Sequence, residues 1–581
     1  MKNKLHHDCE MFSTHYSVSL YAKKQYSLSC QCLSEFVSID EIRKDIEDSI
    51  EAVDGLLMDL DKYISPQINK ILRVNMRYFV PVYAYHLKFQ FHIYRVLLRS
   101  MGRIVDLLNP LEIFFYERGL TSLITGKTTK FLTYFFPNIK KQAIHTSLPK
   151  NNITADKLGS LYSLFYRIYF KTKFGIIHPV QMMFDWLRTI TRENKFSKTK
   201  QTVLIGWPLY EFEFLLTQLK KYNILYFSAD KLYAPKEFKY KSVVKSKGLF
   251  DFSKVDEIYE KNPLMKLLLQ DIKEDFYNNI DSHLNSLEML KELDNVYSIV
   301  CGIWGLPPAF GLKSLIFEYL SHRKIEIIGR QHGSLQGVQY RPWQFDSEFL
   351  RCNYYLSYGF DRNDLKRVYP NKAFQVEVLP YGKPKSENKF ISKREIDILF
   401  PMTNSLSIID GGAARLPCDQ LAQRQLELLE YLSSLKGFSV YVKLMVNSKN
   451  YQSCAVLPIL EKKYNIKVVD NVSLTDFLSS YSPKIVIIEF VSTPLYDVLH
   501  LDSEIFLMDD PVHPYENNAL HELQKRVHFA DKTSEMIHML DSFLKGDLKP
   551  KRDNTYKNHY LSKKNTSKKV DHFIHHLLTD K

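Results

Sequence analysis

The sequence predicts an α/β protein in which two doubly wound parallel sheets face one cleft behind a helical amino-terminal region. Three observations predict it. The 581 residues exceed what a single core accommodates. Strand-like and helix-like segments alternate from about residue 200 to residue 508. Two of the strand-like segments end in polar clusters, at 327–334 and 484–497. Because open α/β sheets bind ligands beyond the carboxyl ends of their strands, the clusters predict two half-sites on one cleft.

The composition and net charge of the chain indicate which kinds of partner it could bind. Hydrophobic residues make up 45% of the chain, which is ordinary for a globular protein. The formal net charge of +14 favours an anionic partner: a nucleic acid, an acidic membrane surface or a phosphorylated small molecule. The sequence has no helix-turn-helix, zinc-finger spacing or RNA-binding signature, so we expect no nucleic-acid partner.

Cysteine usage and hydropathy predict the compartment. The seven cysteines are scattered without CxxC pairs, which favours a reduced, cytoplasmic setting. The first residues lack the apolar core of a signal peptide, and no window reaches the ~18 apolar residues of a spanning helix. Any membrane contact should therefore be peripheral, at the inner face of the cell membrane.

Residues 1–195 are expected to be mostly helical. Ile39, Ile42, Ile46, Ile50, Val53 and Leu57 recur at steps of three and four among acidic residues, the pattern of a one-sided helix. The aromatic segments 76–98 and 161–174 read as buried helices, with membrane docking as the alternative. The basic and aromatic segment 127–141 is the best docking candidate.

Residues 196–385 are expected to form the first, acceptor-side Rossmann-like domain. Its pattern predicts strands at 203–206, 224–227, 296–301 and 324–328, with helices at 211–221 and 310–322. Residues 386–548 are expected to form the second, nucleotide-donor domain. Its predicted strands are 396–400, 438–443, 466–469, 484–488 and 504–508, alternating with helices at 420–435, 452–463, 474–481 and 494–500. Residues 549–581 read as a basic, solvated linker and a closing helix.

The first polar cluster surrounds a histidine. His332 follows a predicted strand and precedes Gly333, where the backbone can turn and a ligand can approach. Its imidazole could accept the proton of a hydroxyl nucleophile; the alternative is a structural histidine. Arg330, Gln331, Gly333 and Ser334 are the candidate acceptor and cleft residues around it.

The second cluster has the residue types of a phosphate and nucleotide site. Ser492 and Thr493 precede Pro494 at a predicted helix start, where free amides and two hydroxyls suit phosphate. An ordinary helix cap is the alternative. Glu489 could accept ribose or sugar hydroxyls, and Lys443 could offer a positive charge to a diphosphate; exposed, solvated side chains are the alternatives for both.

No metal site is expected. Asp509 and Asp510 are adjacent, but neighbouring carboxylates usually point apart and no partner has ligand spacing. Asp59 and Asp61 match a DxD string inside the amphipathic helix. The signatures of serine hydrolases, zinc proteases, kinases and deaminases are also absent from the sequence.

The motif Gln331-His332-Gly333-Ser334, together with residues 489–496, resembles bacterial surface-carbohydrate glycosyltransferases of the GT-B superfamily, of the capsule and lipopolysaccharide type. More loosely it resembles CDP-glycerol glycerophosphotransferases. The resemblance implies that His332 faces the acceptor as a base and that Ser492 and Thr493 hold the donor phosphate. Leu444 and Met445 stand where such families often have His-Pro after the basic residue.

The expected function is transfer of a sugar from a nucleotide-activated donor to a glycan or lipid-linked glycan at the cell surface, without metal or cofactor. Two alternatives remain open: a glycerophosphotransferase acting on a surface polymer, and a non-catalytic scaffold that binds membranes or nucleic acid through the basic tail.

Overall fold

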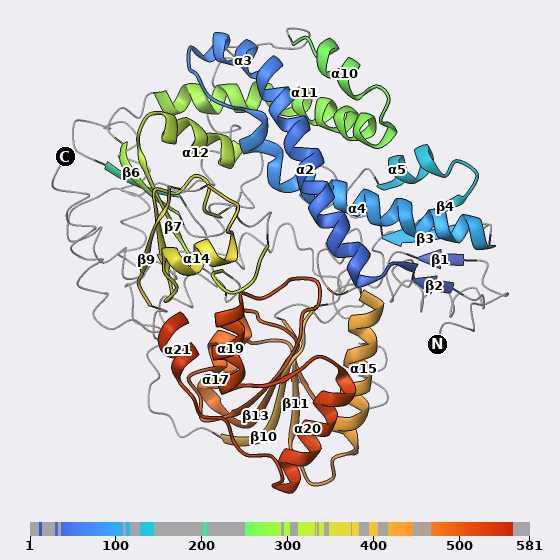
Figure 1. Cartoon of the computed structure of the whole chain (residues 1–581), viewed down its shortest axis with the longest axis vertical. Helices are drawn as coiled ribbons and strands as arrows, with labels where there is room; N and C mark the ends of the chain where they lie inside the picture. Colours follow the sequence, from blue (N-terminus) through green and yellow to red (C-terminus); the bar gives the residue numbers. More distant parts are fainter. Residues whose placement is uncertain are drawn as a thin grey trace.

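A computed structural model gives the structure of the chain. It describes residues 11–13, 30–32, 36–108, 112–116, 128–144, 201–205, 250–291, 296–301, 312–331, 333, 336–341, 345, 348–373, 375–382, 394–404, 416, 418–445, 456 and 466–561. These residues form three sheets in which every strand pair is parallel. The predicted α/β class is thereby confirmed, and so is the helical amino-terminal region (Figure 1).

The second unit, residues 394–561, holds a six-stranded sheet with the order β12-β11-β10-β13-β14-β15. Its strands are β10 (Arg394–Pro401), β11 (Val440–Lys443), β12 (Lys467–Val469), β13 (Tyr481–Ile488), β14 (Glu504–Met508) and β15 (His528–Ala530). Its helices are α15 (Cys418–Ser434), α17 (Leu474–Ser480), α18 (Thr493–Val498), α19 (Asn517–Arg526), α20 (Thr533–Lys545) and α21 (Thr555–Tyr560). In chain order the strands read 3-2-1-4-5-6, the doubly wound order of dinucleotide-binding folds.

The residues of the central strands explain this arrangement. β11 and β14 are buried along their whole length, and the last four residues of β13 are too. Continuous runs of buried, branched residues are typical of parallel strands covered on both faces. Leu429 of α15 and Met536 of α20 pack on one face of the sheet. Phe477 of α17 and Leu523 of α19 belong to the core on the other face.

The first unit, residues 201–205 and 296–382, holds a five-stranded sheet. Its strands are β5 (Gln201–Ile205), β6 (Val296–Cys301), β7 (Glu326–Arg330), β8 (Tyr354–Ser357) and β9 (Glu377–Pro380), and its helices are α12 (Leu312–His322) and α14 (Arg362–Val368). The described strands follow one another in chain order, so a reversal of strand order is seen in the second unit and not among the described strands of the first. The predicted strand 224–227 and helix 211–221 lie outside the described residues.

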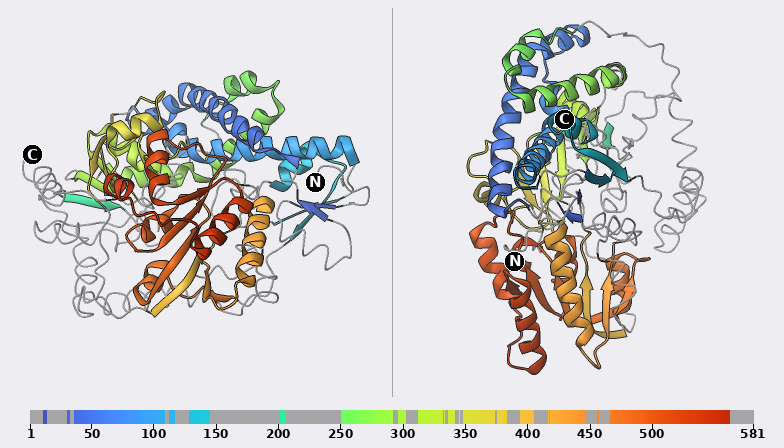
Figure 2. Two further views of the ribbon diagram at one scale, coloured as in Figure 1. Left: turned by 60° about the horizontal axis from the view of Figure 1, so that its bottom comes forward. Right: turned by 90° about the vertical axis from the view of Figure 1, so that its right-hand side faces the viewer.

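The amino-terminal region contains a small parallel sheet that the hydropathy pattern did not predict, with the order β2-β1-β3-β4. Its strands are β1 (Met11–Ser13), β2 (Cys30–Cys32), β3 (Glu112–Tyr116) and β4 (Lys140–Ile144). The helices of this region are α2 (Ile39–Tyr63), α3 (Ser65–Leu72), α4 (Phe79–Leu108) and α5 (Thr128–Phe135), joined by α10 (Ser253–Tyr259) and α11 (Pro263–Lys291) from further along the chain. Three- to five-residue strands are too short for periodicity to reveal. Figure 2 shows these helices at the end of the molecule opposite the second unit.

The predicted amphipathic helix is confirmed as α2. It begins at a capping box formed by Ser38 and Glu41. Its predicted stripe faces inward, with Ile42, Ile46 and Val53 buried. The predicted burial of the aromatic segment 76–98 is also confirmed for the residues of α4 whose side chains are described.

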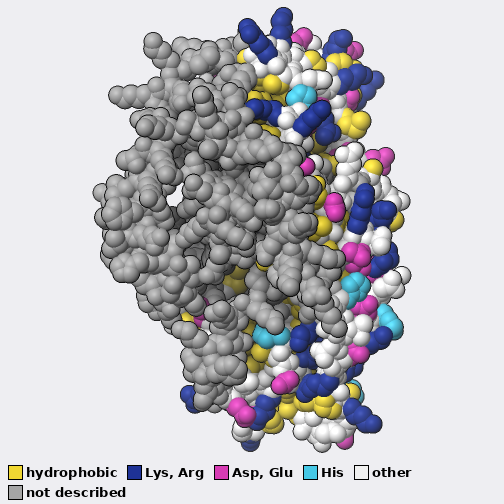
Figure 3. Space-filling model, turned by 90° about the vertical axis from the view of Figure 1, so that its left-hand side faces the viewer, with side chains coloured by type: hydrophobic (Ala, Val, Ile, Leu, Met, Phe, Trp, Pro, Cys, Tyr) yellow, Lys and Arg dark blue, Asp and Glu magenta, His cyan; other side chains and the backbone are white. Residues whose placement is uncertain are grey.

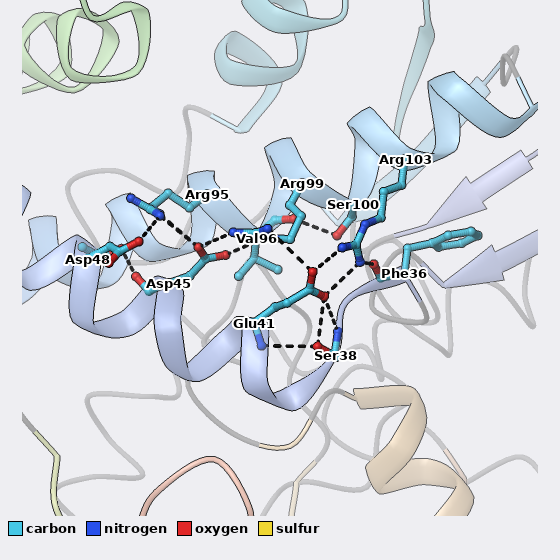
Figure 4. A network of polar contacts seen from close by, with 11 residues as sticks. Phe36, Ser38, Glu41, Asp45, Asp48, Arg95, Val96, Arg99, Ser100 and Arg103 are labelled. Carbon is cyan, nitrogen blue, oxygen red and sulfur yellow. Dashed lines mark hydrogen bonds and ion pairs between the residues drawn. The ribbon is translucent and has the colours of Figure 1, made fainter.

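An ion network fastens α2 to α4 (Figure 4). The fully buried Asp45 accepts hydrogen bonds from Arg95 Nε at 3.1 Å and from Arg99 Nη2 at 2.8 Å. One turn earlier, Glu41 pairs with Arg103. The hydrogen bond from Arg103 holds the pKa of Glu41 down at about 2, so this contact persists to strongly acidic pH. Ion pairs on two successive turns therefore join α2 to α4.

The DxD string has structural roles. Asp59 accepts a hydrogen bond from Tyr259 of α10 at 2.8 Å. Asp61 accepts the backbone N–H groups of Tyr78, Phe79 and Val80 at the start of α4, at 2.7–3.0 Å. Both carboxylates are thus used within the helical region.

The carboxyl-terminal segment corrects one prediction. Within the stretch predicted to be a solvated linker, α21 packs against α19 with Tyr556 and Tyr560 buried, whereas Lys549, Pro550 and Arg552 before it are exposed. The backbone of residues 559–560 also packs against Gly359 of the first unit, so closely that a Cβ atom at position 359 would collide with the His559 carbonyl. The stretch is rich in basic residues, which predicts exposure, but its aromatic side chains provide the apolar area that is buried. The segment after residue 561 lies outside the described residues.

The segment predicted to dock on a membrane, 127–141, does not present an exposed cluster of apolar and basic side chains among its described residues. In 127–141, Phe131 and Leu132 are buried and Lys130 pairs with Asp271, while Tyr134 is about half exposed. On the described part of the face in Figure 3, basic and acidic side chains are interspersed. Within the described residues, no helix combines the length and the apolar character needed to cross a bilayer.

Candidate functional site

The strand order of the second unit defines where a ligand would sit. β10 lies between β11 and β13, and the chain winds away from it in opposite directions on its two sides. Ligands of open α/β sheets bind outside the carboxyl ends of the strands at such a switch point. Thr403 follows β10 and Glu489 follows β13, so these two residues stand at the switch point.

Glu489 is 3% exposed and is held by its neighbours. Its Oε2 accepts the backbone N–H of Thr403 and faces Gln425 Nε2 of α15 at 3.4 Å. Burial raises the pKa of Glu489 to about 7, although the hydrogen bonds from Thr403 and Gln425 act in the opposite direction. The site therefore holds a carboxyl group that changes charge near neutral pH.

Two acceptor oxygens at this point are unused. Among the described residues, neither Glu489 Oε1 nor Gln425 Oε1 accepts a hydrogen bond, and both atoms are buried. An unsatisfied buried acceptor is costly, and a catalytic role or a bound water or ion is among the physical explanations for such a group in a native structure. The pair is suited to a partner that offers more than one donor hydrogen.

The adjacent carboxylates after β14 have separate roles. Burial and the neighbouring Asp510 raise the pKa of Asp509 to about 6. The Asp509 carbonyl accepts a hydrogen bond from Arg424 Nη1 at 2.9 Å. Asp510 instead pairs with Arg341 of the first unit at 3.1 Å, and both side chains are buried. Within the described residues, no group of three or more His, Cys, Asp or Glu side chains could hold a metal ion.

The side chain of Lys443, at the end of β11, folds back onto the backbone of the next residue. Its side chain is 4% exposed and its Nζ donates to the Leu444 carbonyl. Burial lowers the pKa of this ammonium group. The structure gives Lys443 no other hydrogen bond among the described residues, and an ammonium group has three donor hydrogens, so a diphosphate contact depends on reaching the buried Nζ and not on breaking this bond.

Ser492 and Thr493 stand at the start of α18, as predicted. Ser492 occupies the N-cap position in extended backbone, with no side-chain capping bond, and Pro494 lies in the first turn. Thr493 is exposed. The helix has six residues, so its dipole is small, and the two hydroxyls are the more useful groups of this turn.

The histidine loop of the first unit meets α18. A Cβ atom placed on Gly333 would lie 3.5 Å from Thr493 Oγ1. The two predicted half-sites are thus in contact at this point. His332 and Ser334 themselves lie outside the described residues.

Arg330 and Gln331 are buried, and Gln331 supports the loop. Gln331 Nε2 donates to the Gly333 carbonyl at 2.6 Å, and its Oε1 accepts the backbone N–H of Tyr358. Both the amide nitrogen and the oxygen of the Gln331 side chain are therefore hydrogen-bonded to the protein backbone. We interpret Gln331 as a support for the loop that carries His332.

The structure adds residues that sequence reasoning missed. Thr403 could have been found, because it follows a strand that the sequence predicts. Gln425 and Arg424 gave no signal, since they are ordinary polar residues of an amphipathic helix. Arg341 joins Asp510 across 169 residues of chain, a separation that no local pattern encodes.

The two units meet next to this site. Tyr340 N–H donates to the Pro514 carbonyl at 3.0 Å, and Glu516 N–H donates to the Val338 carbonyl at 2.8 Å. With the Arg341–Asp510 pair, these bonds tie the segment after the histidine loop to the segment after β14.

Comparison with known proteins gives distant likenesses. No protein-family model and no curated protein matches the sequence. Among solved structures, the chain is similar to the spinosyn rhamnosyltransferase SpnG in complex with thymidine diphosphate, with a TM-score of 0.31, 9% identity and coverage of 65% of this chain and 96% of that chain. It is also similar to the UDP-GlcNAc 2-epimerase of Neisseria meningitidis bound to UDP-GlcNAc, with a TM-score of 0.37, 12% identity and coverage of 66% and 100%. At TM-scores of this size the likeness carries no argument about activity. The assignment of the site rests on the strand order and on the residues at the switch point.

Proposed function

We propose that this protein is a glycosyltransferase that moves a sugar from a nucleotide-activated donor to a glycan or lipid-linked glycan of the cell surface. One observation carries the proposal: the unused oxygens of Glu489 and Gln425 stand at the switch point of a 3-2-1-4-5-6 sheet. That is where a nucleotide binds in folds of this topology. Vicinal hydroxyls, such as those of ribose, supply the donor hydrogens that these two oxygens lack.

In this proposal the first unit supplies the acceptor side. His332 takes the proton of the acceptor hydroxyl, as a positioned imidazole can near neutral pH. Arg330, Gln331, Gly333 and Ser334 shape the loop that holds it. The contact between Gly333 and Thr493 supports a reaction centre between the two units.

The second unit supplies the donor side. Glu489 accepts hydroxyls of the nucleotide, while Ser492 and Thr493 donate to the departing phosphate. Lys443 adds positive charge to that phosphate through the donor hydrogens that the Leu444 carbonyl does not take. Holding donor and acceptor together lowers the entropic part of the barrier.

The decisive variant is His332→Ala. Sugar transfer should fall by about 10²-fold or more, because removing a general base costs that much, while donor binding should stay within about twofold. Transfer is measured with labelled donor, and donor binding by calorimetry. His322→Ala, which changes an exposed histidine of α12, is the matched control. Unchanged turnover of His332→Ala would remove the base assignment.

A donor panel separates the competing transferase. Calorimetry with CMP, CDP, UDP and GDP compounds distinguishes a sugar transferase from a glycerophosphotransferase, whose donor carries cytidine diphosphate. Absence of any nucleotide binding, together with steeply salt-dependent binding to vesicles or oligonucleotides, would instead favour a scaffold.

A further inference from the structure

A pocket lies at the junction of the two units and α2. It has a volume of about 350 Å³, which is within the range of small-molecule sites. None of the candidate-site residues lines it. Its walls come from Glu47 of α2, from residues 367–372 and Tyr340 of the first unit, and from residues 514–516 of the second. In Figure 1 the lower end of α2 points toward this junction.

The apolar part of the lining consists of rings that neighbouring groups hold in place. Tyr340 and Tyr515 are half-buried and line the pocket, and the hydroxyl group of Tyr515 is buried. The Tyr340 ring lies 5.6 Å from that of Tyr369, and the Tyr515 ring lies 5.9 Å from that of Phe529. Pro370 and Pro514 complete the walls. Fixed aromatic faces bind flat apolar surfaces at little cost in side-chain entropy.

The charges of the lining balance. Arg367 and Lys372 are cationic, and Glu47 and Glu516 are anionic. Arg367 is already engaged, because it pairs with Asp364 and lies 3.3 Å from Glu516. A lining of this kind does not select a phosphate or another compact anion, which needs uncompensated positive charge.

The remaining polar groups match hydroxyls. Within the described residues, the side chains of Glu47 and Asn371 have no hydrogen-bond partner, and both residues are exposed at the rim. A carboxylate accepts hydrogen bonds, and a carboxamide both donates and accepts. A sugar ring presents apolar C–H faces and a rim of hydroxyls that also donate and accept, so it complements rings flanked by such groups.

We infer that this pocket binds a neutral saccharide, as a holding site for a sugar unit of the glycan acceptor. The inference deepens the proposed function, on which the link to the acceptor rests. The segment 509–516 supports that link: it begins at Asp509 on the carboxyl edge of the sheet and ends at the pocket. An acceptor chain bound at both places would follow this segment.

The test uses the full-length protein without nucleotide. Neutral mono- and disaccharides of glucose, galactose and N-acetylglucosamine are titrated by saturation-transfer NMR, with inorganic phosphate and uridine as competitors. At least one saccharide should bind, and the double variant Glu47→Gln/Asn371→Ala should weaken that binding by about tenfold, which corresponds to about 1.4 kcal/mol. Neither competitor should displace it.

The control is Glu51→Gln/Asn75→Ala, which changes exposed residues of the same two types outside the pocket. Its saccharide affinity should equal that of the wild type. Absence of saccharide binding, equal affinity of the two double variants, or displacement by phosphate or uridine would each overturn the inference. Nucleotide binding, measured separately by calorimetry, reports on the proposed function, so the two failures are distinguishable.

Discussion

The side chain of Glu489 is buried, one of its oxygens accepts no hydrogen bond from the described residues, and burial raises its pKa to about 7. A carboxyl group whose pKa is raised on folding costs stability wherever it must ionise in the folded state. Its ordinary pKa of 4.5 applies to the unfolded chain. The folded protein therefore loses stability as the pH rises from 4.5 to about 7, and the full cost is present above 7. Strongly shifted pKa values cluster at functional sites.

Glu489→Gln should separate these two effects. The carboxamide cannot ionise, so above pH 7 the variant should be more stable than the wild type, by at most about 3.5 kcal/mol from ~1.4 kcal/mol per pKa unit. At pH 4.5 the two proteins should be nearly equal. Donor affinity should fall in the same variant. Thermal unfolding at pH 4.5 and pH 8, with calorimetry of nucleotide binding, checks both; a variant less stable at pH 8 would contradict the raised pKa.

At the scale of elements, α2 and α4 are joined through charges that differ in burial. Asp45 is fully buried between Arg95 and Arg99, whereas the Asp48 side chain, which also pairs with Arg95, is 39% exposed. Removing one partner of a buried ion pair leaves an uncompensated charge and is strongly destabilising. An exposed pair contributes little.

Asp45→Ala should therefore lower the free energy of unfolding by about 3 kcal/mol. Asp48→Ala, on the same helix and against the same arginine, should cost less than about 1 kcal/mol. Circular dichroism during urea titration measures both. Equal effects of the two variants would show that the buried network does not fasten α2 to α4.

At the scale of the whole molecule, α21 bridges the two units through His559. Its Nε2 lies 3.1 Å from Asp364 of the first unit, and its Nδ1 lies 3.0 Å from Glu522 of the second. The hydrogen bond with Asp364 is the largest influence that raises the pKa of His559, to about 9. The bridge therefore contributes fully below pH 6.5, and its contribution is lost as the pH rises through 9.

The melting temperature of the wild type should consequently fall more between pH 6.5 and pH 9.5 than that of His559→Gln. Scanning calorimetry at the two pH values measures the difference. His521→Gln, which changes an exposed histidine of the neighbouring α19, should behave like the wild type. If His559→Gln shows the wild-type fall, the bridge does not hold the two units together.

The sequence by itself determined the elements that depend on local pattern. Strands β6 and β14 have the bounds that the hydropathy predicts, and α2 carries the predicted stripe. Short-range periodicity encodes these features because burial on one or both faces repeats along the chain. Predicted strand ends also gave Glu489, Ser492 and Thr493 as candidates.

Tertiary structure alone decided the rest. Strand order placed the switch point between β10 and β13, and with it the roles of Thr403 and Gln425. Long-range pairing also set Gly333 against Thr493 and Arg341 against Asp510. Such contacts join residues more than 150 positions apart. Their free energy depends on how whole sheets and helices pack, which no local window of sequence contains.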